Sequence, residues 1–514
     1  RDGRYCGYLI DGPQKYTIIQ ATDSDWKHKL AGERIGFFSG DNRYYIYQTG
    51  DSLCFLPLVD GVYTVMKNVA TYNLRDDDNR NEWLAIELKD KTVLLQNLLN
   101  GKEKRFTNVG NYSFERGNNW FSCQLNNATR KLATVELSTG ETRNYEHIIG
   151  HRFYQNGQVL ILQTEQEDAQ SLLWVNPLNG KISLVWTANA QDSSNISSYA
   201  VDKVGQRLVF IMQTGSAMNK SIWYYKKGMD KAVQKALNDP TGKIAGLELT
   251  GTPLFSDDGR YIIISMRESV MDKRKPQADA VQVNVWNYRD TFLMSAQVSA
   301  DGTNGELNEW LKEETYTFSM PAEGEGVASN LSGAHERLFV AGGKEYAAIN
   351  KRLITDRFWE DWATPEIYIV SLRDGKRISL RKGISSQFSP DGTWMLCYDS
   401  KSGQYLRYDI DTKKYTNLSG AGIYFGEENE FYGTGRQPQL RRGIAGWLEG
   451  GKSLLVYDHY DIWQLDVTGK KPPINLTNGR RNKIRFEIIR KDWEVGSSTF
   501  YGSLDRLMLT AVNM

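Results

Sequence analysis

One turn that recurs along the chain limits its fold more than any other feature. In four places an aromatic residue is followed by a polar turn and then by a run of apolar residues. The four copies are GFFSGDNRYYIYQ (36–48), PLFSDDGRYIIIS (253–265), SQFSPDGTWMLCYD (386–399) and AGWLEGGKSLLVYD (445–458). Because Asp, Asn and Gly tolerate positive φ, this turn between apolar runs predicts a tight β-hairpin.

A second motif consists of an apolar strand, a turn that contains Gly-Lys, and another strand. Its clearest copies are LLWVNPLNGKISLVW (172–186), EIYIVSLRDGKRISLR (366–381) and DIWQLDVTGKKPPINLT (461–477). One hairpin of each kind gives a unit of four antiparallel strands. The turns of the first motif and their weaker copies lie about forty residues apart in the first half of the chain and further apart in the second.

A unit of about forty residues with four strands is typical of a β-propeller blade. A single such sheet cannot bury both of its faces, whereas blades packed around an axis bury both and leave only short edges. We therefore expect residues 1–514 to form an all-β chain, a β-propeller of four-stranded antiparallel blades. About eight blades are expected, within a range of about seven to nine. Two propellers are the structural alternative.

Both ends of the propeller are expected to be incomplete. Arg1, Asp2, Gly3, Arg4 and Tyr5 repeat the turn and second strand of a unit without its first strand, and the last residues read as a strand without its neighbour. The chain begins with Arg1 and shows no signal-peptide pattern, so we expect a processed or partial product. The units are predicted near 1–33, 34–70, 71–110, 111–148, 149–190, 196–235, 250–299, 327–382, 383–420 and 443–479, with insertions at 299–326, 356–365 and 420–442.

Charge and cysteine content exclude some classes of partner. The net charge of +1 gives no global field for nucleic acid or for an anionic membrane, so neither partner is expected. No apolar run is long enough to span a bilayer. Cys6, Cys54, Cys123 and Cys397 are far apart and form no C-x-x-C pair, so we expect buried free thiols and no zinc site.

The segment GWLEGGKS (446–453) matches the phosphate-binding P-loop pattern. A P-loop follows a buried strand and opens a helix, whose N-terminus binds phosphate. Here the following residues, LLVYDHYDIWQLDV, are rich in β-branched and aromatic residues and predict two short strands. The glycines and Lys452 are therefore predicted to form a blade turn, and no nucleotide or other cofactor is expected.

No catalytic or metal-binding residues are predicted in this chain. The hydrolase elbow G-x-S-x-G is absent, and the last histidine, His459, lies within a unit, so the order Ser, Asp, His cannot be completed after either partial elbow. His147 and His151 are four residues apart but are expected in a loop rather than on one face of a helix. The acidic run 76–78 is expected to be a turn rather than a calcium site, and the basic run 480–483 a solvated turn or a contact surface rather than a nucleic-acid site.

Insertions are the expected place for specificity, because scaffolds carry it in their loops. Paired glutamates could hold a substrate ammonium through charge-assisted hydrogen bonds, although adjacent glutamates on a loop often only face solvent. The candidate substrate-binding residues are Trp359, Glu360, Trp362, Glu427, Glu428, Arg441 and Arg442.

The FSxDGRY and FSPDGTW turns, with their IYxxxLxxGKxxxLT partners, resemble the propeller of the prolyl oligopeptidase family of serine peptidases. The segment 454–479 is similar to late blades of large bacterial, dipeptidyl-peptidase-like members. S-P-D-G turns also occur in TolB-like propellers. The resemblance covers essentially the whole chain, but it is a resemblance to the propeller domain of these proteins only.

This resemblance implies a propeller that gates and binds the peptide substrate of a C-terminal α/β-hydrolase domain, which is absent from this sequence. In dipeptidyl-peptidase-type members a glutamate pair in the pattern D-W-x-x-E-E holds the substrate amino terminus. Trp359 to Trp362 and the pair Glu427 and Glu428 repeat that pattern only in part.

We therefore expect a non-catalytic chain within a parent serine peptidase, a hydrolase. The family resemblance implies an exported or periplasmic protein and leaves a homodimer open. The alternative is a TolB-like or stand-alone propeller that binds a protein or a glycan.

Overall fold

The computed structural model describes residues 3–59, 62–75, 82–115, 119–167, 169–188, 194–215, 219–237, 244–268, 315–333, 336–340, 344–351, 366–381, 384–426, 443–489, 500–502 and 507–513. These residues form β-strands joined by turns, with two short 3-10 helices, Gln155–Gly157 and Arg480–Asn482. The chain divides into two compact units, Arg1–Ser194 and Asn195–Met514. No helix in the described part is long and apolar enough to cross a membrane.

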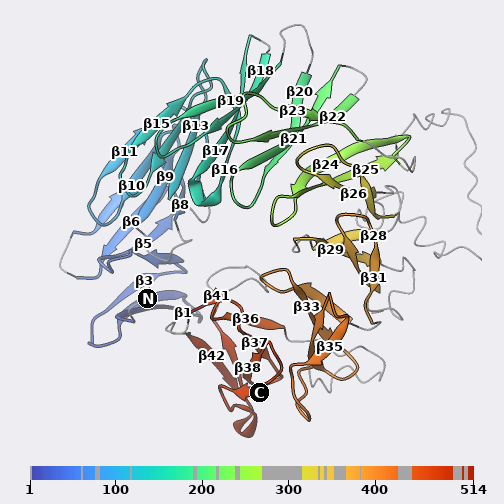
Figure 1. The fold of residues 1–514 in the computed structure, drawn as a ribbon. Helices are drawn as coiled ribbons and strands as arrows, with labels where there is room; N and C mark the ends of the chain where they lie inside the picture. Colours follow the sequence, from blue (N-terminus) through green and yellow to red (C-terminus); the bar gives the residue numbers. More distant parts are fainter. Residues whose placement is uncertain are drawn as a thin grey trace, which may run out of the picture. The chain divides into compact units, whose positions relative to one another are not determined.

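The first unit contains one three-stranded sheet followed by four-stranded sheets, each built from consecutive strands (Figure 1). The strands of its sheets are, in chain order, β1 (Tyr5–Ile10), β2 (Tyr16–Ala21) and β3 (Lys27–Ala31); β4 (Gly36–Phe38), β5 (Tyr44–Thr49), β6 (Ser52–Pro57) and β7 (Thr64–Met66); β8 (Val69–Leu74), β9 (Trp83–Leu88), β10 (Val93–Asn97) and β11 (Glu103–Phe106); β12 (Val109–Phe114), β13 (Trp120–Leu125), β14 (Leu132–Glu136) and β15 (Thr142–Tyr145); β16 (Ile148–Tyr154), β17 (Val159–Gln166), β18 (Ala169–Val175) and β19 (Ile182–Thr187).

The second unit continues the same pattern and ends in a five-stranded sheet and a two-stranded ribbon. Its sheets consist of β20 (Ser194–Val201), β21 (Arg207–Thr214), β22 (Asn219–Lys226) and β23 (Val233–Lys235); β24 (Leu247–Phe255), β25 (Tyr261–Glu268), β26 (Thr315–Pro321) and β27 (Ser329–Ser332); β28 (Glu336–Val340), β29 (Tyr346–Lys351), β30 (Glu366–Ser371) and β31 (Arg377–Ser379); β32 (Ile384–Phe388), β33 (Trp394–Asp399), β34 (Gln404–Asp409) and β35 (Lys414–Asn417); β36 (Ile444–Leu448), β37 (Ser453–Tyr457), β38 (Ile462–Asp466), β39 (Ile474–Asn475) and β41 (Phe500–Tyr501); β40 (Ile484–Ile488) and β42 (Leu509–Asn513).

The predicted all-β propeller fold is confirmed by this arrangement. Among the described residues, eight sheets have four strands in consecutive order, as expected for propeller blades. One sheet departs from its predicted limits, because β26 and β27 lie where an insertion and the next unit were expected. The side chains of Thr317, Phe318, Ser319 and Met320 are all buried, so this segment is part of the sheet and not a surface insertion.

The recurring turn has the same hydrogen bonds in three sheets. Ser39 Oγ donates to Asp41 Oδ1 at 2.8 Å, and the equivalent Ser256–Asp258 and Ser389–Asp391 bonds measure 2.8 and 2.6 Å. Each aspartate also accepts a backbone N–H from two residues further on. Burial alone would raise the pKa of the three aspartates, but these hydrogen bonds outweigh it and lower the pKa.

The left-handed position of this turn is occupied by glycine in two copies and by Asn42, with a φ of 56°, in the first copy. The φ angles of Gly259 and Gly392 are 71° and 70°, as the hairpin assignment predicts. In the segment that matches the P-loop pattern, Gly450 and Gly451 have φ angles of 68° and 98° and join β36 to β37. A strand rather than a helix follows Lys452, so the prediction of a blade turn is confirmed.

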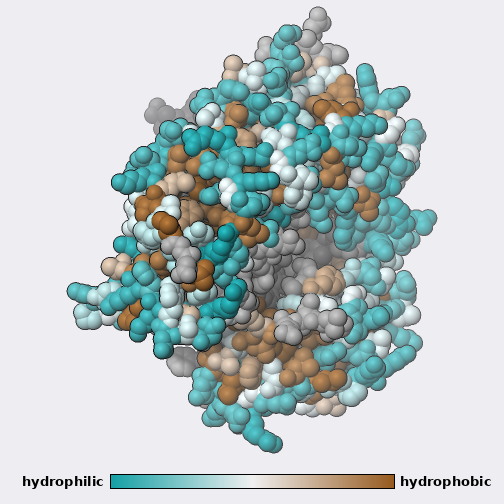
Figure 2. Space-filling view, turned by 90° about the vertical axis from the view of Figure 1, so that its left-hand side faces the viewer, coloured by the Kyte–Doolittle hydropathy of each residue, from teal (hydrophilic) through white to brown (hydrophobic). Residues whose placement is uncertain are grey.

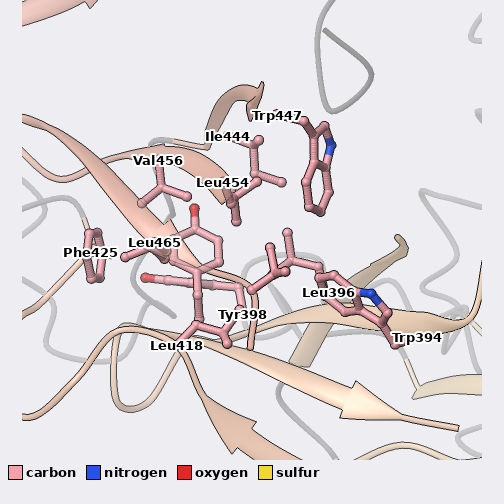
Figure 3. Close-up of a cluster of buried hydrophobic side chains, with 12 residues drawn as sticks. Trp394, Leu396, Tyr398, Leu418, Phe425, Ile444, Trp447, Leu454, Val456 and Leu465 are labelled. Atoms are coloured by element: carbon pink, nitrogen blue, oxygen red, sulfur yellow. The ribbon is translucent and has the colours of Figure 1, made fainter. Parts of the chain in front are cut away.

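The core lies between successive sheets. In the first unit, Trp83 and Ala85 of β9 pack toward the sheet of β12–β15, whereas Leu84 and Ile86 pack toward the sheet of β4–β7. In the second unit, a cluster that includes Trp394, Leu396, Trp447 and Leu454 fills the space between two neighbouring sheets (Figure 3). Each large apolar side chain buried in this way contributes about 1.5–3 kcal/mol. Because both faces of each sheet are buried, its central strands are almost continuously apolar.

The cysteine prediction holds for three of the four residues. Cys54, Cys123 and Cys397 are buried free thiols, but Cys6 is exposed. Cys6 lies on β1, at the edge of its sheet, whereas the other three lie on strands with neighbours on both sides. The side of the molecule in Figure 2 is mostly hydrophilic, with separate hydrophobic patches.

Candidate functional site

The first strands of three successive sheets in the first unit, β8, β12 and β16, are built alike. A residue with positive φ precedes each strand: Asn68 (63°), Asn108 (60°) and His147 (59°). Each strand then carries a β-bulge one residue after its start. His147 is therefore the left-handed residue of a connection and corresponds to an asparagine in the neighbouring sheets.

The same position bonds each first strand to the sheet before it. The N–H of Val69 donates to the carbonyl of Asp51 at 2.9 Å, that of Val109 to Lys91 at 2.9 Å, and that of Ile148 to Arg130 at 3.1 Å. These bonds fix the first strands in a common register relative to the preceding sheets. Side chains at equivalent positions of β8, β12 and β16 are thereby placed in a row.

Apart from Ala70 at the bulge of β8, the exposed side chains of this row are polar and mostly uncharged. They are Thr71 and Asn73 of β8, Asn111 and Ser113 of β12, and Arg152 of β16, and we refer to them as the polar strand face. In a propeller the blades surround a central channel, which is where such a surface can meet a ligand.

Glu115 directly follows β12 and gathers polar groups from three strands. Ser122 Oγ of β13 donates to Glu115 Oε1 at 2.6 Å, and Ser113 Oγ of β12 donates to the same oxygen at 3.1 Å. His151 Nε2 of β16 lies 3.6 Å from this oxygen. The side chains of Glu115 and His151 are 19% and 16% exposed, so the group is partly open to solvent.

Burial alone would raise the pKa of Glu115, but the His151 imidazole and the two serine hydroxyls outweigh it and lower the pKa. Glu115 is therefore a carboxylate at neutral pH. In a catalytic triad the histidine lies between serine and the acid and takes the serine proton. Here both serines donate directly to the carboxylate, so the group does not activate a nucleophile. A partly open carboxylate of this kind can accept hydrogen bonds from an ammonium or amide group.

The structure changes one of the sequence-based assignments and adds a buried partner to another. His151 lies within β16 and not in a loop, because the bulged strand begins already at Ile148. Arg480 lies in an exposed 3-10 turn, as expected for the basic run, and its guanidinium donates to Asp458 at 3.0 Å, whose side chain is only 1% exposed. The polar residues between β37 and β38 are the sequence signal for this buried carboxylate.

A second buried carboxylate, Asp461, holds the loop after β39. It accepts hydrogen bonds from the Thr477 hydroxyl at 2.8 Å, the Asn475 amide at 3.0 Å and the Gly479 N–H. Burial alone would raise the pKa of Asp461, but these bonds outweigh it and lower the pKa. The acceptor sites of Asp461 are thus used within the fold, which indicates a structural anchor.

All seven predicted substrate-binding residues lie outside the described residues: Trp359, Glu360, Trp362, Glu427, Glu428, Arg441 and Arg442. The acidic run 76–78 also lies outside them. Sequence reasoning missed Glu115, because no motif surrounds it. Glu115 could have been found by aligning two first strands, VATYNLR (69–75) and VGNYSFE (109–115). In this alignment the last position changes from Arg75 to Glu115.

No protein-family model matches the chain, and no curated protein matches it. Among solved structures it is similar to the tricorn protease, with a TM-score of 0.31 and 9% identity, over 81% of this chain and 42% of that one. For the β-propeller domain of the Trilobed protease from Pyrococcus furiosus the TM-score is 0.30 and the identity 7%, over 72% and 97%. For a prolyl endopeptidase the values are 0.31 and 11%, over 68% and 49%.

The chain thus spans less than half the length of the tricorn protease and of the prolyl endopeptidase that it matches. All three similar structures are proteases or a part of one. The similarity is too low to assign an activity. The propeller fold is assigned from the four-stranded sheets of this chain itself.

Proposed function

We propose that this chain is the substrate-gating and peptide-binding propeller of a prolyl-oligopeptidase-like serine peptidase and is itself non-catalytic. The proposal combines the family resemblance of the recurring turns with one feature of the first unit, the polar strand face that ends at Glu115. Uncharged polar side chains can exchange hydrogen bonds with an extended peptide without selecting one side-chain type.

Glu115 adds a fixed negative charge to this face. Its carboxylate is held by Ser113 and Ser122 and is partly open, so a peptide ammonium can approach it without breaking the sheet. A charge-assisted hydrogen bond of this kind is worth about 1.5–3 kcal/mol, enough to retain a peptide by its amino terminus. We propose that Glu115 contributes to substrate binding in addition to any contribution from Glu427 and Glu428.

The first experiment determines whether a hydrolase belongs to this chain. The complete protein that contains residues 1–514 is expected to react with a fluorophosphonate label and to cleave prolyl peptides, whereas residues 1–514 alone should do neither. If the complete protein carries no reactive serine, the peptidase assignment is wrong. Retention of a protein or glycan by residues 1–514 would then favour the alternative, a TolB-like binding propeller.

The second experiment tests Glu115 within the active protein. Glu115→Gln keeps the shape and removes the charge, so KM for a peptide with a free amino terminus should rise about tenfold or more. KM for the same peptide with an acetylated amino terminus should not change. A similar loss for both peptides would show that Glu115 has only a structural role.

A further inference from the structure

Gln96 is a polar residue at a position that is apolar in comparable sheets. The N–H of Leu98, two residues after Gln96, donates to the carbonyl of Glu82 at 2.7 Å, which fixes the place of Gln96 in its sheet. The equivalent bonds of Leu58, Leu137 and Leu372 place Leu56, Val135 and Val370 at the same position. These three side chains are at most 4% exposed. The amide of Gln96 therefore stands where the other sheets have a buried aliphatic side chain.

The Gln96 side chain points toward the preceding sheet, β4–β7. Leu94 and Leu98, two residues to either side of it, pack against that sheet with Phe55, and successive side chains of a strand alternate between its two faces. The side-chain oxygen of Gln96, Oε1, is buried and accepts no hydrogen bond from the part of the chain that the structure describes. Such an acceptor destabilises the fold, because folding takes it from water and returns no donor. A bound molecule with an N–H group would satisfy it.

A cavity of about 340 Å³ lies beside Gln96, between the sheet of β4–β7 and the sheet of β8–β11. Its walls are mainly apolar and aromatic, formed by Tyr44, Phe55, Met66 and Leu98. The rings of Tyr44 and Phe55 are nearly perpendicular, at 89°, with their centroids 6.3 Å apart. Ligand cavities of proteins have volumes of roughly 300–1,000 Å³ and combine apolar walls with a few polar groups. This cavity has both properties.

Arg43 joins the two walls of the cavity. Its Nη2 donates to the carbonyl oxygens of Leu98 at 2.9 Å and Leu99 at 2.7 Å, and its Nε donates to the Asp41 carboxylate. These bonds hold the turn after β10 against the preceding sheet, so the cavity is already formed without a ligand. Arg43 is the one charged residue in the cavity lining, all of which lies in the described ranges, and Asp41 balances its charge. The cavity therefore favours a neutral ligand.

The second unit has a cavity at the same place in its own sheets, but with a different lining. This cavity has a volume of about 380 Å³ and lies between the sheets of β20–β23 and β24–β27. Tyr224 occupies the place of Phe55, because the N–H groups three residues after them donate to equivalent carbonyls. The charged residues of this lining are Lys226, Lys235, Glu323 and Glu325. An apolar ring would remove these charges from water, so only the cavity beside Gln96 suits such a ring.

We propose that the cavity beside Gln96 binds one small molecule that carries an indole ring. Its volume is more than twice the ~150 Å³ of a cavity that holds benzene, so it has room for two fused rings. Aromatic walls favour stacked and edge-to-face contacts with such a ring. The N–H of indole donates a hydrogen bond and accepts none, so it matches the single unpaired acceptor, Gln96 Oε1. The space is too small for an extended peptide segment, and the occupant is therefore a free molecule.

Equilibrium dialysis of residues 1–514 with indole and with 1-methylindole tests the hydrogen bond. The chain should bind one indole, and 1-methylindole, which lacks the N–H, should bind about two- to tenfold more weakly. Gln96→Leu restores an aliphatic side chain at this position, so this variant should bind the two molecules equally well. Indole that shows no saturable binding, or a preference for indole that persists in Gln96→Leu, would overturn the proposal.

Two variants of β7 test where indole binds. Thr64 lines the cavity, whereas Val65 is 42% exposed and does not line it. Thr64→Trp should fill the cavity with its own ring and abolish binding, and the matched control Val65→Trp should leave binding unchanged. Both residues are exposed, so both variants should fold. Binding that is lost in both variants, or in neither, would place indole elsewhere and contradict the proposal. Tighter binding of N-acetyltryptophanamide than of indole would also contradict it, because the occupant would then be a tryptophan side chain of a peptide.

Discussion

The left-handed glycine at the recurring turn leads to a quantitative prediction. A Cβ atom on Gly259 would lie 2.9 Å from Asp202 Oδ2 and 3.0 Å from Arg207 Nη1, which belong to the preceding sheet. The Asp202 side chain is 0% exposed, and its carboxylate pairs with Arg207 at 3.0 Å. Gly259→Ala therefore both strains the backbone and displaces a buried ion pair.

The two costs can be separated. Alanine in the left-handed region costs about 1–2 kcal/mol. Weakening a buried charge pair adds a further cost of about 1–3 kcal/mol, since a pair that loses one partner completely costs about 3–5 kcal/mol. The free energy of unfolding should thus fall by about 2–5 kcal/mol in Gly259→Ala.

Gly324→Ala is the control for the backbone cost alone. Gly324 has a φ of 69°, close to the 71° of Gly259, and no atom lies within 4 Å of the added Cβ. The assay is the free energy of local opening from amide exchange in β21 and β25, because a chain of many sheets need not unfold in two states. If the two variants lose the same stability, the contact between the Gly259 turn and the Asp202–Arg207 pair does not stabilise the two sheets.

Three further predictions concern a carboxylate, a lysine and a thiol. Hydrogen bonds lower the pKa of Asp391 in the folded protein. The stability that this carboxylate contributes is therefore complete above the unfolded pKa of about 3.9 and is lost as the pH falls through the lower folded pKa. Asp391→Asn should remove this part of the acid unfolding curve, and an unchanged curve would contradict the prediction. Lys452→Ala should change the free energy of unfolding by less than about 0.5 kcal/mol. Calorimetry should detect no ATP binding by either the wild-type protein or this variant. The folded protein should react with one maleimide, at Cys6, because the other three cysteines are buried. Burial also raises the pKa of Cys123 and Cys397 to about 12, which disfavours the reactive thiolate. Peptide mapping that finds the label on another cysteine would refute this prediction.

The repeat is the part of this protein that its sequence determines by itself. The Ser, Asp and Gly of the recurring turn form hydrogen bonds within a few residues of one another, so the hairpin is a local structure. Apolar runs on both sides of the turn then require sheets with both faces buried. The propeller fold, the turn at Lys452 and the positive φ of Gly259 and Gly392 follow from these local rules.

Other features depend on contacts between residues far apart in the chain, and only the tertiary structure shows them. Glu115 meets His151 because successive first strands are bonded to the preceding sheets, and no local motif contains both residues. Phe318 and Met320 belong to a blade because they fill the space between two sheets, although their segment reads as an acidic, glycine-rich insertion. The exposure of Cys6 likewise depends on which strands pair with β1, and pairing between distant segments is not a property of the strand itself.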